Sequence, residues 1–435
     1  MSTFLFVTIP IPAHTTNPMP LAARLVEGGH SVVWLAGQAF HERLASTGAI
    51  PLPYRDTPDF SGRDIAETFP QLVGLDGVRG IRRAFADIFV GLAAERVADI
   101  QRVLRHHPID AMLTDGISYG PGLVHELGGP PWASFGDGPL PFEDADAPPF
   151  GPGLLPMPGP LGRARNAAVR VVGKRVVFGP AQHRWDQIRR DLGLPTGPGV
   201  LASAPSPLLH LQGCMPSFDY PMAEPPPQVH WVGPLRPDPS PWHQPPWWVE
   251  VLRSPRPMIL VSQGSIRSDV TELTTPTIRA LADLPVNVVV TTGQASPADV
   301  LAASGGTLPP NTHVTDFIPY DTALAHASCF VTNGGYTGVT LALAHGVPIV
   351  QAGTTEEKAE IGARIHYTGV GIRLGTSRPT PQVVRAAVRS VLDDSRYAIA
   401  AGRMQAECSH LDAGSRGADL LVELARTRRL VPVRG

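Results

Sequence analysis

The chain has 435 residues, of which 43% are hydrophobic, and this length favours two domains with a buried core each. Its formal net charge is −2, so it lacks the strongly basic surface that binding to nucleic acid requires. The three cysteines are Cys214, Cys329 and Cys408, an odd and widely spaced set that predicts neither a disulfide framework nor a zinc site and fits a reducing compartment.

The apolar run Thr3–Ile11 opens the chain without a preceding basic segment, and Pro10 and Pro12 interrupt it. These features predict a first strand rather than a signal peptide. The sequence contains no run of 18 apolar residues, the length that a membrane-spanning helix needs. We therefore expect a cytoplasmic protein without a membrane span.

Short apolar runs alternate with helical patterns along the first half of the chain. The predicted strands are Thr3–Ile11, Ser31–Ala36, Ile50–Tyr54, Ala111–Asp115, Trp132–Phe135 and Pro207–Gln212. The predicted helices are Pro18–Glu27, a stretch ending near Ser46, a less regular region Ala66–Arg105, Ser118–Leu127 and a long helix ending near Asp191. This alternation is typical of βαβ units on a parallel sheet.

Two segments of the first half lack this alternation. Asp137–Leu161 is rich in proline and glycine but carries apolar side chains, which in a loop either fold back on a core or line a binding cleft. The stretch from Pro216 to Pro257 contains 13 prolines and four tryptophans, and we interpret it as a linker stiffened by proline.

A second series of strands and helices follows. The predicted strands are Met258–Ser262, Asn287–Thr292, His313–Phe317, Cys329–Thr332, Pro348–Ala352 and Gly371–Leu374, and the predicted helices are Val270–Asp283, Pro381–Leu392, Ser395–His410 and Ser415–Arg426. We predict an α/β protein of two doubly wound, Rossmann-like domains facing each other across a cleft at the carboxyl ends of their strands. The predicted units are residues 1–215, the linker 216–257, residues 258–412 and a final helical segment 413–435.

The turn Asn333-Gly334-Gly335 joins a predicted strand to a helix without charged residues. Two adjacent glycines let the backbone approach a ligand closely, and the exposed N–H groups of the helix start attract an anion by about 0.3–1 kcal/mol per charge. An ordinary strand-to-helix turn is the alternative interpretation.

Several motifs together resemble the GT-B fold UDP-glycosyltransferase-like family. They are Pro12-Ala13-His14 followed by Pro20-Leu21-Ala22, Val261–Ser265, Asp316–Pro319, Thr332–Pro348 and Glu357-Lys358. The resemblance covers nearly the whole chain, and the Asn333 turn is similar to a bacterial subset with rhamnosyltransferase-like natural-product members. It implies inverting, metal-independent transfer of a sugar from a dTDP- or UDP-sugar to a small apolar natural product, and a last helix that returns to the first domain.

The resemblance places the catalytic base at His14, after the first strand. General base catalysis by an imidazole typically contributes about 10²–10⁴-fold to the rate. Asp115, at the end of another strand, would hold the imidazole tautomer and stabilise the imidazolium. The alternative interpretation makes His14 a turn residue and Asp115 a helix cap.

The resemblance also implies a donor site in the second domain. Its predicted residues are Gly264, Ser265, Ile318, Asn333, Gly334, Gly335, Thr337, Glu357 and Lys358. The glycines, Ser265 and Asn333 would receive the diphosphate, the Ile318 backbone the nucleobase, and Glu357 and Lys358 the sugar hydroxyls. Glu357 and Lys358 are alternatively the exposed first turn of a helix.

Three positions depart from the family pattern. Asn333 replaces the usual histidine, Gly338 replaces a serine or threonine, and Leu341 replaces the glutamate that commonly holds the ribose hydroxyls. These departures concern the identity of the donor more than the reaction.

The acidic pair Asp144 and Asp146 lies in a proline-rich loop, so we interpret it as a solvated patch and predict no metal and no cofactor beyond the sugar nucleotide. The predicted partners are that nucleotide and a small-molecule acceptor, with a homodimer also compatible. The candidate acceptor residues are Phe85, Phe89, Phe135 and Phe142, although Phe85 and Phe89 also fit a core. Two other functions remain open, a non-catalytic partner protein of the same fold and a sugar-nucleotide epimerase.

Overall fold

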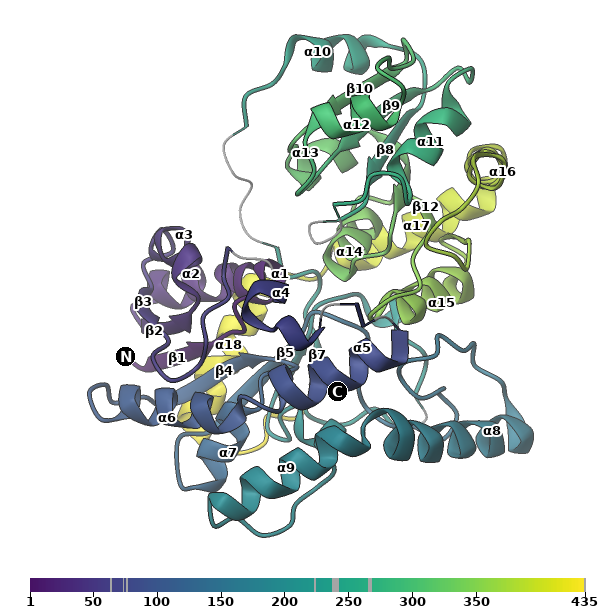
Figure 1. The fold of residues 1–435 in the computed structure, drawn as a ribbon. Coiled ribbons are helices and arrows are strands. Elements are labelled where there is room, and N and C mark those ends of the chain that lie inside the picture. The colour runs from purple at the N-terminus through teal and green to yellow at the C-terminus, as the bar shows by residue number, and fades with distance from the viewer. Residues whose placement is uncertain are drawn as a thin grey trace.

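The computed structural model describes residues 1–62, 65–72, 74–75, 77–222, 224–236, 242–264 and 268–433. Two α/β domains, each built on one parallel sheet, make up the fold (Figure 1). The first sheet contains β1 (Thr3–Val7), β2 (Ser31–Ala36), β3 (Ile50–Pro53), β4 (Ala111–Asp115), β5 (Trp132–Gly136), β6 (His210–Gln212) and β7 (Val229–Trp231). Their spatial order is β3-β2-β1-β4-β5-β6-β7, and Phe4 of β1 pairs with Val32 on one side and Ala111 on the other.

The second sheet repeats this topology with six strands in the order β10-β9-β8-β11-β12-β13. The strands are β8 (Met258–Ser262), β9 (Asn287–Thr291), β10 (Thr312–Thr315), β11 (Ala327–Thr332), β12 (Ile349–Gln351) and β13 (Gly371–Arg373). The strand order reverses at β1/β4 in the first sheet and at β8/β11 in the second, and ligands of such sheets bind at these points. The predicted fold class is confirmed.

The helices of the first domain cover both faces of its sheet. The α-helices are α1 (Pro12–Thr16), α2 (Met19–Glu27), α3 (His41–Ala45), α4 (Ile65–Thr68), α5 (Gly77–Ala84), α6 (Ala93–Leu104), α7 (Gly120–Glu126), α8 (Gly159–Val172) and α9 (Gly179–Asp191). The π- and 3₁₀-turns are η1 (Gln38–Phe40), η2 (Pro70–Leu72), η3 (Phe85–Phe89), η4 (Gly173–Val177), η5 (Val200–Ser203) and η6 (Pro216–Phe218). The predicted long helix ending near Asp191 consists of α8 and α9, which are joined by the short π-helix η4.

The second domain and the chain end contain nine further helices within the described residues. They are α10 (Pro246–Arg253), α11 (Thr274–Leu281), α12 (Pro297–Ala303), α13 (Tyr320–Leu324), α14 (Tyr336–Ala344), α15 (Lys358–Thr368), α16 (Pro381–Asp393), α17 (Ser395–Cys408) and α18 (Ala413–Thr427). The sequence analysis missed α12, although Ser296 and Asp299 form a capping box at its start. None of the described helices is long and apolar enough to cross a membrane.

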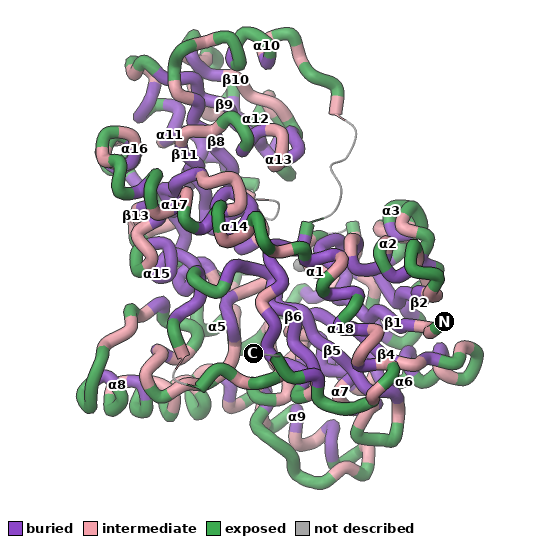
Figure 2. Tube along the Cα trace, turned by 180° about the vertical axis from the view of Figure 1, so that it is seen from behind, coloured by how far each residue is buried: buried purple, intermediate pink, exposed green. Residues whose placement is uncertain are grey.

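Alternation along β1 divides the first core into two layers. Phe4 and Phe6 pack with α2 and α18, whereas Leu5 and Val7 pack with the side chains of α6, α7 and α9. Both faces of the strand are buried, as parallel strands between two helical layers require. In Figure 2 the central strands are coloured as buried, whereas much of α9 is coloured as exposed.

The last helix, α18, lies against the first domain (Figure 1). Its Leu420, Leu421 and Leu424 are buried in the same cluster as Phe4. A Cβ on Gly417 would lie 2.2 Å from the Leu21 side chain, so only glycine allows this close approach of α18 to α2. The chain therefore crosses back after the second sheet is complete.

The first sheet also extends further along the chain than predicted. Its last strand β7 falls inside the stretch 216–257 that the sequence analysis assigns to a linker, and β7 pairs in parallel with β6. The strand has only three residues, and the prolines around it conceal the pattern. The other domain boundaries stay a prediction.

Candidate active site

His14 stands at the carboxyl end of β1, next to the switch point of the first sheet. Pro12 occupies the first position of α1, so only four residues separate the helix from the end of β1, and it places His14 at the sheet edge. Asp115 ends the adjacent β4, and Asp137 directly follows β5. Since neighbouring parallel strands end at one edge, the three side chains meet there.

The nearer partner of His14 is Asp137. Its Oδ2 lies 2.6 Å from His14 Nδ1, whereas Asp115 Oδ1 lies 3.6 Å from the same nitrogen. The contact with Asp137 is short but is not aligned as a hydrogen bond, so it acts chiefly through charge. The sequence analysis missed Asp137, although it closely follows the predicted strand Trp132–Phe135, because only the pairing of β5 with β4 brings it near His14.

Backbone groups hold Asp115 in place. Its Oδ2 accepts from the N–H of Ile9 at 3.0 Å, and its Oδ1 accepts from the N–H of Ile117 at 3.1 Å. The side chain is fully buried. Asp115 thus ties the loop after β1 to the turn after β4 while remaining within charge range of His14. It does not cap a helix, because α7 begins only at Gly120 and its N-cap residue is Tyr119.

These two carboxylates control the protonation of His14. Burial lowers the pKa of the imidazole, but the negative charges of Asp137 and Asp115 raise it by more, so the pKa lies well above its usual value. The two carboxylates therefore make His14 a stronger base and stabilise the imidazolium that forms when it accepts a proton.

The turn between β11 and α14 lies at the corresponding switch point of the second sheet. Gly334 has a φ of 95°, and a Cβ there would lie 2.8 Å from the Gln351 side chain. Asn333 donates from Nδ2 to the carbonyl of Gln263 and accepts from the N–H of Gly335 at 3.2 Å. The Asn333 amide therefore fastens the turn to the loop after β8.

Gly264 completes this arrangement. It has a φ of 84°, and a Cβ there would lie 3.0 Å from Asn333 Nδ2. The structure thus brings Gly264 together with the Asn333–Gly335 turn, as predicted for one donor site. The predicted partner Ser265 lies outside the described residues.

An open pocket with about 240 Å³ of empty space lies beside the turn. Its walls are Gln263, Glu272, Leu273, Asn333, Ala352, Gly353, Thr355, Lys358 and Ser377. The Lys358 ammonium pairs with Glu356, a residue in the left-handed region with a φ of 50°. Glu357 is the half-buried N-cap residue of α15, and Lys358 is buried and lines the pocket. The two residues begin a helix, but its first turn is not the exposed one of the alternative interpretation.

Comparisons with known proteins agree with this geometry. Residues 275–415 match the family described as the erythromycin biosynthesis protein CIII-like, C-terminal domain. The chain is 39% identical over 420 residues to 4'-demethylrebeccamycin synthase of Lentzea aerocolonigenes, covering 96% of this chain and 98% of that protein. This chain belongs to the UDP-glycosyltransferase-like family of natural-product glycosyltransferases. Members of the family use nucleotide sugars.

Further relatives and solved structures support the same assignment. UDP-glycosyltransferase 2 of Phaeomoniella chlamydospora is 31% identical over 97% of this glycosyltransferase and 95% of its own length. The glycosyltransferase of kitacinnamycin superimposes with a TM-score of 0.73 at 22% identity, over 98% of both chains. VinC, solved in complex with dTDP, superimposes with a TM-score of 0.69 at 20% identity, over 98% of this chain and 99% of that one. These structures share the fold.

The remaining predicted donor residues, and the two other positions that depart from the family pattern, do not line the pocket beside the turn. Thr337 Oγ1 accepts from Asn17 Nδ2 at 3.1 Å, so this residue of the glycosyltransferase links the second domain to the first. The side chain of Ile318 is buried in the second core, and only its backbone is available to a nucleobase. Leu341 is buried in the same core and offers no hydrogen-bond acceptor. A Cβ on Gly338 would lie 3.4 Å from the Phe330 ring.

The four predicted acceptor phenylalanines divide into three groups. Phe135 is fully buried in the first core, so its predicted acceptor role is wrong: alternation along β5 turns it inward. Phe85 and Phe89 are partly buried, stack edge-on with ring centroids 5.1 Å apart and lie on the π-turn η3. Phe142 lines a second pocket between the domains.

The acidic pair in the proline-rich loop is engaged by its neighbours. Asp146 pairs with Arg163 at 2.7 Å, and Asp144 Oδ1 accepts from the N–H of Asp146 at 2.7 Å. Among the described residues, no group of three or more His, Cys, Asp and Glu side chains is placed to hold a metal ion. Metal independence stays a prediction.

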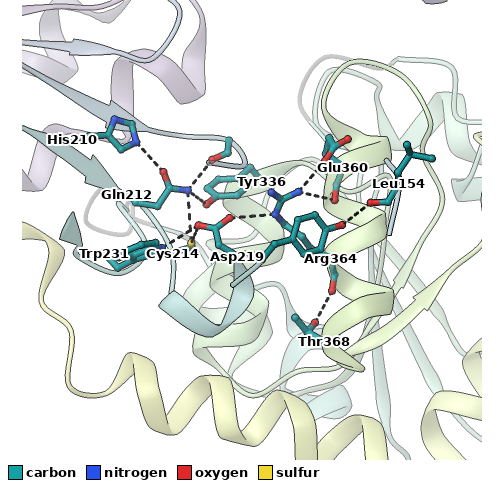
Figure 3. Close-up of polar contacts among 12 residues, drawn as sticks. Leu154, His210, Gln212, Cys214, Asp219, Trp231, Tyr336, Glu360, Arg364 and Thr368 are labelled. Carbon is teal, nitrogen blue, oxygen red and sulfur yellow. Dashed lines mark hydrogen bonds and ion pairs between the residues drawn. The ribbon is translucent and has the colours of Figure 1, made fainter. Parts of the chain in front are cut away.

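A buried polar network joins the two domains (Figure 3). Gln212 at the end of β6 donates to the Tyr336 hydroxyl at 2.8 Å, directly at the start of α14. Arg364 of α15 lies between Asp219 and Glu360, with contacts of 3.2 and 3.0 Å. The sequence analysis gave none of these side chains a contact between the domains, because Gln212 meets Tyr336, and Asp219 meets Arg364, only when the domains meet.

Proposed function

We propose that this glycosyltransferase transfers a sugar from a dTDP- or UDP-sugar to a small apolar natural product with inversion at the anomeric carbon, and that His14 is the general base. The observation that carries the proposal is the His14 imidazole, held through Nδ1 beside two carboxylates at the switch point of the first sheet. Three residues further on, Asn17 contacts Thr337 of the nucleotide domain, so His14 lies near the junction of both domains.

In the proposed reaction, His14 Nε2 accepts the proton of the acceptor nucleophile while Nδ1 faces Asp137 and Asp115. The nucleophile forms a bond to the anomeric carbon from the face opposite the diphosphate. The bond between that carbon and the diphosphate oxygen breaks, and its electron pair leaves with the diphosphate. N–H groups at the start of α14, which no side chain caps, stabilise the developing charge without a metal.

Leu341 affects which nucleotide sugar the proposed donor site can select. A buried leucine accepts no hydrogen bond from a ribose 2′-hydroxyl, so the site gains no selectivity for ribose over deoxyribose at this position. Two neighbours of the same fold, VinC and the spinosyn rhamnosyltransferase SpnG, were solved with dTDP, whereas several relatives are named UDP-glucosyltransferases. Both nucleotides therefore belong in the test.

The proposed acceptor is apolar because Phe142 and Phe150, on the loop that begins with Asp137, line the pocket between the domains, and Phe89 of η3 packs against the cluster of Ile9 and Ile11 that precedes His14. The relative named 4'-demethylrebeccamycin synthase makes a natural product by its name. We further propose that the reaction takes place in the cytoplasm, because the three cysteines are odd in number and widely spaced, as expected in a reducing compartment.

The test is a transfer assay with dTDP-glucose and UDP-glucose against a panel of planar phenols and indoles, with and without EDTA. We expect a β-glucoside from these α-linked donors and an unchanged rate in EDTA. An α-glucoside, or a rate abolished by EDTA and restored by a divalent cation, would contradict the proposal. Release of free sugar or an epimer without any acceptor would favour the epimerase alternative.

A further inference from the structure

One segment of the first domain reaches into the second. The loop 137–158 starts at Asp137 beside His14 and ends at α8, and between these points it meets α15. Glu360 Oε1 accepts from the N–H of Gly151 at 3.0 Å and from the N–H of Gly153 at 2.6 Å. Arg373 Nη1 donates to the carbonyl of Gly153 at 2.8 Å. Three hydrogen bonds thus fix the loop to residues more than 200 positions away.

Glu360 is itself held rigidly. Its side chain is 1% exposed and pairs with Arg364, which also pairs with Asp219 of the first domain (Figure 3). The Arg364 guanidinium lies 4.3 Å from the centre of the Tyr220 ring. Charges buried to this degree are tolerated only when paired and hydrogen-bonded, and here each carboxylate has such partners.

The loop and α15 each carry other parts of the proposed site. The loop begins with the carboxylate nearest His14 and contains Phe142 and Phe150, which line the pocket between the domains together with Glu360 and Arg364. The helix α15 begins with Lys358, which lines the pocket beside the donor turn. The predicted sugar contact Lys358 and the group that holds the loop, Glu360, are therefore two residues apart in α15.

We propose that Glu360 is a positioning residue for the acceptor, acting through the amides of Gly151 and Gly153 on the loop 137–158. The proposal rests on the proposed function. Glu360 belongs to the nucleotide domain, yet it sets the position of a loop that forms one wall of the acceptor site. The acceptor site is complete only when α15 is docked on that loop.

Two variants distinguish an effect of the position of the loop from an effect of the buried charges. Gly153→Ala acts from the loop side: Gly153 has a φ of 60°, and a Cβ there would lie 2.3 Å from the carbonyl oxygen of Ala359, so the loop must move while every charge remains. Glu360→Gln acts from the helix side: an amide that turns its oxygen to the two N–H groups presents its NH₂ to Arg364.

Matched controls exist for both variants. Gly402→Ala lies in α17, where a Cβ meets nothing within 4 Å. Asp283→Asn removes a carboxylate from the exposed pair with Arg385, in the same domain as Glu360. Both controls are expected to keep wild-type kinetics.

The kinetic test uses the acceptor found in the transfer assay and dTDP as the nucleotide probe. We expect both variants to raise the acceptor KM by about tenfold or more, while the Kd of dTDP in calorimetry stays within about twofold. An unchanged acceptor KM in both variants would overturn the proposal. A Kd for dTDP that rises in parallel with the acceptor KM would also overturn it, because Glu360 would then support the whole domain.

Hydrogen exchange provides a readout that needs no activity. Amides of the peptide covering residues 148–158 should exchange about tenfold faster in Glu360→Gln and Gly153→Ala than in wild type and the controls. Unchanged exchange in that peptide overturns the proposal. If the two variants exchange faster but the wild-type protein transfers no sugar to any acceptor, the contact between Glu360 and the loop is confirmed and the proposed function is refuted instead. If Gly153→Ala fails to fold in a thermal melt, Glu360→Gln alone decides.

Discussion

The His14 cluster and the Asn333–Gly335 turn occupy equivalent places in their two sheets, yet different parts of the chain build them. His14 and Asp115 follow β1 and β4, and Gly264 and Asn333 follow β8 and β11, which are the strands on either side of each switch point. The first site consists of charged side chains. The second consists of glycine backbone and one neutral amide.

This difference separates two chemical tasks. Proton transfer needs a titratable group whose pKa is tuned by neighbouring charge, and the first site supplies an imidazole beside two carboxylates. Binding a diphosphate needs N–H groups at close range, and the second site supplies glycines where a Cβ would collide with Asn333 or Gln351. One topology therefore supports both tasks because only the residues at the strand ends differ.

Asp137→Asn tests the first site, and among the variants that leave His14 in place we expect it to change catalysis most. Removing the negative charge lowers the pKa of His14, so the acid limb of the pH profile of kcat/KM moves to lower pH. The rate on the high-pH plateau falls by about tenfold because a less basic imidazole accepts the proton less readily. Steady-state kinetics across pH measures both effects, and Asp186→Asn on α9 is the control. An unmoved acid limb would show that Asp137 does not act on His14.

Gly334→Ala tests the second site from the backbone side. The left-handed φ and the collision with Gln351 distort the turn, so we expect the Kd of dTDP to rise by about tenfold. The acid limb of the kcat/KM profile should stay where it is in wild type, because no charge near His14 changes. Gly402→Ala is the control, and calorimetry gives the affinity. Wild-type affinity for dTDP in Gly334→Ala would mean that the turn does not receive the diphosphate.

A smaller effect concerns stability. The folded protein raises the pKa of His14, so the stabilisation from its ion pairs is fully present below about pH 6.5, the unfolded value, and is lost as the pH rises through the folded pKa. The Tm gap between wild type and Asp137→Asn should therefore be widest near pH 5.5 and amount to about a few degrees. It should narrow at alkaline pH. A Tm difference that grows as the pH becomes alkaline would contradict the predicted direction of the pH dependence.

The smallest effect is expected at the contact between the two sites. Asn17→Ala removes one partly buried hydrogen bond to Thr337, worth about 0.5–1.5 kcal/mol. We expect kcat/KM for the donor to fall by about two- to tenfold, and Thr337→Val to behave similarly. A double mutant that falls no further than either single mutant would attribute the loss to this bond, whereas additive losses would refute the attribution.

The sequence predicts the two sheets well because buried parallel strands appear as uninterrupted apolar runs, such as Met258–Ser262. His14 and Asp115 were predictable because Asp115 is the last residue of such a run and His14 follows another by a few residues, within a motif of a known family. Asp137 escaped prediction because its neighbours Gly136 and Gly138 resemble any loop, and only the pairing of β5 with β4 brings it near His14. Phe135 was misassigned because its side of β5 is fixed by tertiary packing.

The junction between the domains was the least predictable part. Asp219 is far along the chain from Arg364 and Glu360, and charged residues on a helix usually face solvent. The capping box of α12, by contrast, is a local pattern that the sequence does contain. Local signals therefore yield elements and strand-end residues, whereas contacts between domains need the structure.

The most direct test of the account is to measure, in His14→Ala, both the rate of sugar transfer and the Kd of dTDP. The account predicts that transfer falls by about 10²-fold or more while the Kd stays within about twofold of wild type, because the base and the diphosphate site lie in different domains. Transfer at near the wild-type rate, or a loss of dTDP binding that matches the loss of transfer, would contradict it.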